Sequence, residues 1–219
     1  MFCCGGTKHM EAREKTLCRV FCLSGVVSLV FYLLHDVVGA MNYPGYQWMS
    51  QAVSDLTATD APSYTIASGF SSIYGIMSVV CCLFVYVLAM HRHKITRIGL
   101  GLFSVMNLIS AVGYSLFPLS SAGYDGSVPS FIHVYVITAA VVLLSIVSLI
   151  LIAIGSLKDQ RKKLGILAFA ALALMFIGAV GSGIVPKACF GILERFSTYS
   201  AVVFTAILGA SFFADKQGS

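Results

Sequence analysis

The sequence predicts an all-α integral membrane protein whose six helices cross the membrane as one bundle. The chain has 219 residues, of which 58% are hydrophobic and 11% charged, and its mean hydropathy is +0.90. A soluble domain of this size could not bury so much apolar surface. About 20 residues span the roughly 30 Å hydrocarbon layer. Six stretches are long enough, at about 18–40, 64–90, 98–117, 131–157, 164–185 and 197–214, and they form one transmembrane domain over 1–219.

Lysine and arginine are divided unequally between the two sides of this predicted bundle. Twelve of the fourteen lie in the N-terminal segment, the second–third and fourth–fifth connections and the C-terminal tail, and only Lys187 and Arg195 lie on the opposite side. The positive-inside rule then predicts a multi-pass protein of the plasma membrane with both termini in the cytoplasm. Because the basic residues are split among short segments, they argue against a nucleic-acid surface. The partner that this pattern indicates is the lipid bilayer.

The first outer loop is expected to contain a short amphipathic helix over about 47–58. Its apolar and polar residues separate at helical spacing, which is typical of a helix lying on the membrane surface. The apolar face comprises Trp48, Met49, Ala52, Val53 and Leu56. The polar face carries Ser54 and Asp55 and is expected to roof the bundle, while Tyr46 and Trp48 sit at the headgroup level.

Polar and ionisable residues gather in the outer half of the predicted bundle. On insertion scales such a residue costs about 2.5–3.5 kcal/mol within a span, so it usually has a partner or a function. We expect these side chains to line an outward-facing pocket beneath the loop. They are His35, Asp36, Ser54, Asp55, His133, Glu194 and Arg195.

One interpretation of this pocket is a site that binds or moves a small amphiphile or lipid. Its ligand-binding residues are then His35, Asp36, Tyr46, Glu194 and Arg195, with the planar guanidinium holding an anionic head and the histidine responding to protonation. A buried ion pair between Arg195 and a carboxylate, with Asp55, Glu194 and Asp36 as the candidates, is the competing interpretation and involves no ligand. A third is that the charged cluster is structural and the protein acts through assembly with a partner.

An enzymatic interpretation uses partly different residues. His133 is the candidate base, Ser54 the candidate nucleophile, and Asp55 or Asp36 the candidate orienting carboxylate of a membrane lipid hydrolase or transferase. His35, Asp36 and His133 also suit a zinc or iron site by residue type. The sequence contains no paired-histidine spacing, so a histidine hydrogen-bonded to aspartate is the alternative. Neither a cofactor nor an oligomeric state follows from the sequence.

Several motifs together resemble one family. The segments N-Y-P-G-Y at 42–46, S-D-L at 54–56 and G-I-L-E-R at 191–195, with His133 opening the fourth helix, are similar to an uncharacterised group of prokaryotic six-helix membrane proteins, known as domain of unknown function 998. The resemblance covers nearly the whole chain and implies a six-helix bundle with no agreed activity. The matched positions are Tyr43, Pro44, Gly45, Tyr46, Ser54, Asp55, His133, Glu194 and Arg195.

A second resemblance bears on the enzymatic interpretation. Alkaline ceramidases and the progestin-and-adiponectin receptors are similar in placing a serine, an aspartate and histidines near one membrane face. Those proteins carry three histidines for zinc and usually seven helices. This chain offers only His35 and His133 on that side, together with six helices, so the zinc-hydrolase interpretation is the weaker one.

Overall fold

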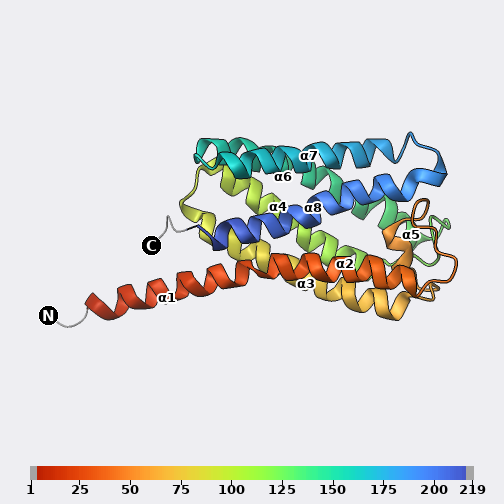
Figure 1. The fold of residues 1–219 in the computed structure, drawn as a ribbon, viewed down its shortest axis with the longest axis horizontal. Coiled ribbons are helices and arrows are strands. Elements are labelled where there is room, and N and C mark those ends of the chain that lie inside the picture. The colour runs from red at the N-terminus through yellow and green to blue at the C-terminus, as the bar shows by residue number, and fades with distance from the viewer. Residues whose placement is uncertain (1–3, 216–219) are drawn as a thin grey trace.

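The computed structural model describes residues 4–215, and within them six helical segments are long and apolar enough to cross a membrane, as predicted. These segments are Arg13–Met41, Tyr64–His91, Lys94–Leu116, Val128–Lys158, Lys162–Gly181 and Lys187–Phe213. They run side by side as one elongated bundle, and the N-terminal part of the first projects beyond it (Figure 1). The fold is therefore that of a multi-pass membrane protein.

Some of these spans contain more than one helical element. The first joins α1 (Cys4–Cys22) to α2 (Ser24–Met41) through Leu23. The others are α3 (Tyr64–Leu88) with η2 (Ala89–His91), α4 (Lys94–Leu116), α5 (Val128–Phe131) with η3 (Ile132–Ile137) and α6 (Thr138–Lys158), α7 (Lys162–Gly181), and η4 (Lys187–Cys189) with α8 (Phe190–Phe213).

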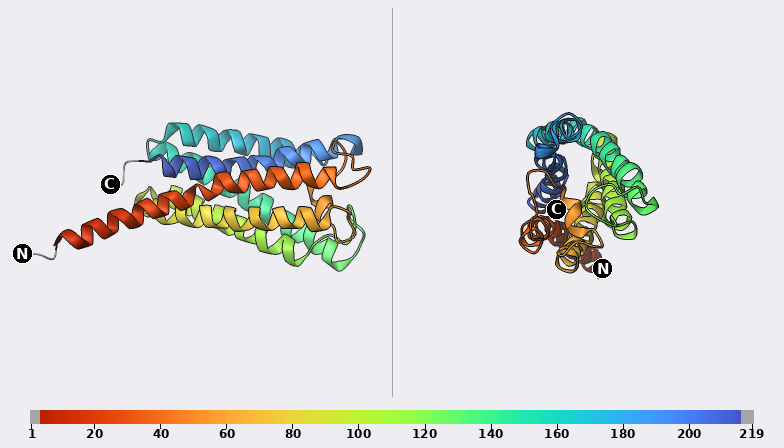
Figure 2. Two further views of the ribbon diagram at one scale, coloured as in Figure 1. Left: turned by 60° about the horizontal axis from the view of Figure 1, so that its bottom comes forward. Right: turned by 90° about the vertical axis from the view of Figure 1, so that its right-hand side faces the viewer.

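The helices are arranged as a closed ring. In the order α2, α3, α4, α6, α7 and α8, each helix packs against the next, and α8 returns to pack against α2. The end-on view in Figure 2 shows this ring. Close approach depends on glycine in places, because a Cβ at Gly178 of α7 would lie 2.2 Å from the amide nitrogen of Ser197 in α8. Small residues at a helix contact permit such packing in lipid, where no hydrophobic force draws helices together.

The two ends of the bundle differ in character. We call the end that holds residues 89–94, 158–163 and the last turn of α8 the basic end. The end that holds the connections 42–63, 117–127 and 182–189 is called the loop end (Figure 1). The larger apolar cluster, which includes Leu100, Phe103 and Phe204, joins α1, α3, α4, α6, α7 and α8. A smaller cluster that includes Tyr32, Val53 and Leu56 joins the first loop to the helices of the loop end.

The first loop differs from the predicted continuous helix over 47–58. Only η1 (Val53–Thr57) is helical, as a 3₁₀ turn, and residues 48–51 form turns. The apolar side of η1 faces the bundle, since Val53 and Leu56 are buried. The carbonyl groups of Trp48 and Gln51 accept hydrogen bonds from Arg195, so they are directed at a side chain instead of at a following helical turn. The prediction failed because an arginine distant in sequence competes for these carbonyls.

Candidate functional site

Arg195 and Asp36 form a buried ion pair between the two helices that close the ring. The guanidinium donates from Nη2 to Asp36 Oδ1 at 2.8 Å and from Nε to Oδ2 at 3.0 Å. Both side chains are almost fully buried, at 4% and 3% exposure. The Tyr199 hydroxyl, one turn further along α8, donates to Asp36 Oδ2 at 2.9 Å. This two-pronged geometry is the strongest arrangement of an arginine and a carboxylate.

The rest of the Arg195 guanidinium binds the chain itself. Nη1 donates to the carbonyl oxygens of Trp48 at 2.8 Å, Gly191 at 3.0 Å and Gln51 at 3.2 Å. Nη2 also donates to the Tyr46 hydroxyl at 2.8 Å. A guanidinium has five N–H donors, and each nitrogen that carries them is engaged here. Arg195 is therefore satisfied by protein groups alone, which favours the ion-pair interpretation over an exposed anion-binding arginine.

The first loop is shaped around this arginine. The Tyr46 hydroxyl, which accepts from Arg195, donates to the Ala52 carbonyl at 2.7 Å. Trp48 lies with its ring centroid 4.6 Å from the guanidinium carbon, a distance at which a cation and an aromatic face attract each other. Gly191 permits the approach, because a Cβ there would lie 2.3 Å from the Gln51 carbonyl oxygen and 2.6 Å from that of Trp48.

Glu194 and Asp55 also connect the first loop to other segments. Glu194 Oε2 accepts from the Val53 amide at 3.3 Å. Asp55 is buried and accepts from the Ala52 amide at 3.2 Å and from the Gly123 amide at 2.9 Å. Burial raises the pKa of Asp55 above its ordinary value, and its hydrogen bonds to backbone amides oppose the rise. The two carboxylates thus attach η1 to α8 and to the 117–127 connection.

His133 belongs to a separate part of the loop end. It lies in η3, a π-helical turn, and its Nδ1 is 2.8 Å from the Phe117 carbonyl oxygen. Its ring packs 4.6 Å from the ring of Tyr114, and its own carbonyl accepts from Thr138. π-helical turns inside α-helices are frequent at functional sites. Since a carbonyl only accepts, Nδ1 carries the proton in the neutral ring and Nε2 is the unprotonated nitrogen.

The structure does not assemble the enzymatic constellations predicted from the sequence. Asp55 is bonded to backbone amides and Asp36 to Arg195 and Tyr199, so neither carboxylate orients His133. The half-buried Ser54 has no hydrogen bond to His133 in the described chain. No group of three potential metal ligands occurs among residues 13–215, so His35, Asp36 and His133 do not form a three-ligand site there.

His35 lies in the interior of the loop end, one residue before Asp36 in α2. It is 4% exposed, and neither of its ring nitrogens has a hydrogen-bond partner in the part of the chain that the structure describes. Its nearest aromatic neighbour is Tyr32, edge to face at 5.5 Å between centroids. Tyr32 in turn contacts Tyr74 at 4.9 Å and Tyr199 at 5.1 Å. An imidazole therefore lies at the border of a tyrosine-rich interior and the Asp36–Arg195 pair.

Some residues of this region were missed by sequence reasoning. Tyr199 donates to Asp36, and the carbonyls of Trp48 and Gln51 receive Arg195. The last helix was predicted from 197, whereas α8 begins at Phe190, so Glu194 and Arg195 lie within it. A helix starting there would have placed Tyr199 four residues after Arg195 on the same face. Backbone carbonyl partners leave no signal in the sequence.

Comparison with known proteins identifies the family and no nearer relative. The model of the family described as "Protein of unknown function (DUF998)" matches residues 26–211. No curated protein and no solved structure matches the chain. The match extends from the third residue of α2 to the last turn of α8, so it covers the six-helix ring, and α1 lies outside it. The chain belongs to the DUF998 family of proteins of unknown function.

Proposed function

We propose that the loop end of the bundle binds the polar head of a small amphiphile or lipid, with His35 as its principal hydrogen-bonding contact. The observation that carries the proposal is the buried imidazole with two unpartnered nitrogens. A buried polar group without a partner costs about 1–3 kcal/mol, and such groups in native proteins call for an explanation. A ligand that accepts from one nitrogen and donates to the other would remove this cost.

The neighbours of His35 suit an amphiphile. The rings of Tyr32, Tyr74 and Tyr199 form a contact series beside it and would pack against an apolar portion. Glu194 offers a second carboxylate oxygen, Oε1, whose one contact among described residues is Thr198 at 3.4 Å. In this proposal the Asp36–Arg195 pair holds the site together and does not receive the head itself, because its donors and acceptors are engaged.

The test is the identification of molecules that remain bound after purification in a mild detergent. Mass spectrometry of the wild-type protein should detect one amphiphile species near one per chain. His35→Leu should lose it because leucine can neither donate nor accept, whereas His91→Leu, a change of an exposed histidine at the basic end, should retain it. Equal retention by His35→Leu, or a wild-type protein that carries only detergent, would refute the proposal.

A hydrolytic reaction at His133 is the second candidate. It is favoured by the hydrogen bond from Nδ1 to the Phe117 carbonyl, which leaves Nε2 able to accept a proton. In this candidate Ser54 acts as the nucleophile once substrate binding brings it to His133. His133→Ala should abolish turnover of a lipid ester while the thermal unfolding temperature stays within a few degrees. Unchanged turnover would eliminate this candidate.

The orientation in the membrane is also a proposal. The basic end carries most of the lysine and arginine residues, and the positive-inside rule places such an end in the cytoplasm of a plasma-membrane protein. A cysteine introduced at Lys163 should be labelled by a membrane-impermeant thiol reagent only after the membrane is opened. A cysteine introduced at Lys187 should be labelled in intact cells. The reverse pattern would invert the topology.

A further inference from the structure

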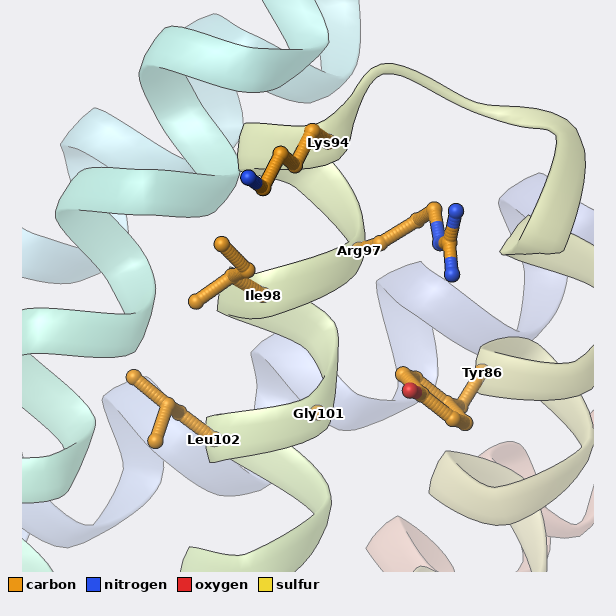
Figure 3. A pocket seen from close by; sticks show the side chains of 6 residues that line it. All are labelled: Tyr86, Lys94, Arg97, Ile98, Gly101 and Leu102. Atoms are coloured by element: carbon orange, nitrogen blue, oxygen red, sulfur yellow. The ribbon is translucent and has the colours of Figure 1, made fainter.

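A surface groove lies at the basic end, far from the loop-end site. Its volume is about 460 Å³, and it follows one face of α4 beside the last turns of α3. The lining residues are Tyr86, Lys94, Arg97, Ile98, Gly101 and Leu102. Figure 3 shows Arg97 extending on the Tyr86 side of α4, while Lys94, Ile98 and Leu102 extend on the other side and Gly101 lies between them. We call this feature the α4 groove.

The part of the α4 groove beside the first turn of α4, which holds Lys94 and Arg97, carries uncompensated positive charge. Arg92 and Arg161 at the same end both pair with Asp215, whereas neither Lys94 nor Arg97 has an ion pair within residues 13–215. Arg97 Nε is buried without a hydrogen-bond partner in the same range. The first turn of α4 adds the partial positive charge of a helix N-terminus. These features together attract an anion.

Asp159, a carboxylate beside the start of α4, forms no ion pair with Lys94 or Arg97. At the end of α6, it accepts from the His93 amide at 2.9 Å and from the Thr96 hydroxyl. Both of its oxygens are thus used to cap the start of α4. His93 itself accepts from the Ile95 amide through Nδ1. Asp159 therefore fixes the position of the α4 N-terminus and leaves Lys94 and Arg97 unpaired.

The rest of the α4 groove, beside Ile98, Gly101 and Leu102, is apolar and continues toward the middle of the span. Ile98 is 47% exposed, and Val105, about two turns further along α4, is also 47% exposed. Gly101 contributes no side chain, and the Tyr86 ring lies beside it, 3.2 Å from where a Cβ would stand. A recess that is charged at the end of the span and apolar toward its middle has the polarity of one phospholipid at the membrane surface.

We infer that the α4 groove binds an anionic phospholipid, with its phosphate against Lys94 and Arg97 and an acyl chain along Ile98 and Leu102. The shared chemistry is a phosphate anion, and free phosphate is the other possible source. The apolar wall favours the lipid, because a free ion would make no use of Ile98, Gly101 or Leu102. This site is independent of the proposed loop-end site and shares no residue with it.

The experiment titrates the full chain, in an uncharged detergent, with phosphatidylglycerol, phosphatidylcholine or inorganic phosphate, and measures bound lipid by native mass spectrometry. Phosphatidylglycerol should bind in preference to phosphatidylcholine, and 10-fold excess inorganic phosphate should not displace it. Lys94→Gln and Arg97→Gln should each weaken its binding about fivefold, as expected for one basic residue at an anionic lipid surface. The control Lys163→Gln removes an exposed charge at the same end and should change nothing.

Several results would overturn the inference. Equal binding of the two lipids would show that the headgroup charge is not recognised. An equal loss in Lys163→Gln would indicate diffuse attraction to the basic end, and displacement by inorganic phosphate would assign the site to the free anion. Lys94→Gln keeps the test decisive if Arg97→Gln unfolds, because Lys94 is exposed and has no side-chain hydrogen bond in the described chain.

Discussion

Removing the guanidinium of Arg195 should destabilise the protein more than any surface change. In Arg195→Ala, Asp36 would keep a buried charge whose remaining partner is the Tyr199 hydroxyl, and the first-loop carbonyls of Trp48 and Gln51 would lose their donor. Breaking one side of a buried ion pair costs about 3–5 kcal/mol. For a chain of this length, about 1 kcal/mol shifts the unfolding midpoint by roughly 2–4 °C. We therefore expect a fall of roughly 6–20 °C.

The assay is thermal unfolding in detergent, followed by intrinsic fluorescence and by limited proteolysis of the first loop. Because the carbonyls of Trp48 and Gln51 are held by Arg195, cleavage near them should accelerate in Arg195→Ala. The double variant Asp36→Leu/Arg195→Leu should recover part of the loss, since it leaves no unpaired charge. Arg13→Ala, at an exposed position, is the matched control. A midpoint within 2 °C of wild type and unchanged cleavage would refute the reasoning.

Three further changes test the rest of the loop end. In protein stripped of bound amphiphile, His35→Leu should raise the free energy of unfolding by about 1–3 kcal/mol, because it removes a buried polar ring that has no partner there; a destabilised variant in a denaturant titration would contradict this. Burial raises the pKa of Asp55, so its folded state favours the protonated form. Stability should therefore fall as pH rises above 3.8, the ordinary pKa, and level off above the folded pKa. Asp55→Asn should flatten that part of the midpoint-against-pH curve, and an unaltered slope would assign it to another group. Gly191→Ala should cost about 1–3 kcal/mol by overpacking against the first loop, whereas Gly69→Ala, with open space around it, should not; equal midpoints would disprove the close contact.

The sequence predicted the membrane helices well because their signal is a property of each segment alone. The run from Tyr64, for example, is apolar over its whole length, and α3 begins at that residue. The start of the last helix was predicted too late, because polar residues such as Glu194 and Arg195 lowered the local hydropathy of a turn that is nevertheless helical. Their polarity is tolerated there because each has a partner from another segment.

The arrangement of the candidate site was less predictable. The polar residues were located at one end of the bundle, and Asp36 was among the partners considered for Arg195. The sequence could not show which carboxylate is chosen, because that depends on α2 and α8 being neighbours in the ring. It also could not show that His133 bonds to the Phe117 carbonyl, since backbone acceptors look alike in any sequence.

The position of Arg195 near the end of the chain imposes an order on biosynthesis. Its contact with the Trp48 carbonyl joins residues 147 positions apart. At ribosomal rates of about 5–20 residues per second, the first loop and Asp36 must wait roughly 7–30 s for their partner. By the end of that interval the first five spans have been made, but the ring is still open between α2 and α7. The last helix thus closes the ring and supplies the arginine that pairs with Asp36 of α2. A nascent chain stopped before this helix would leave the Asp36 carboxylate unpaired and open to recognition by membrane quality control.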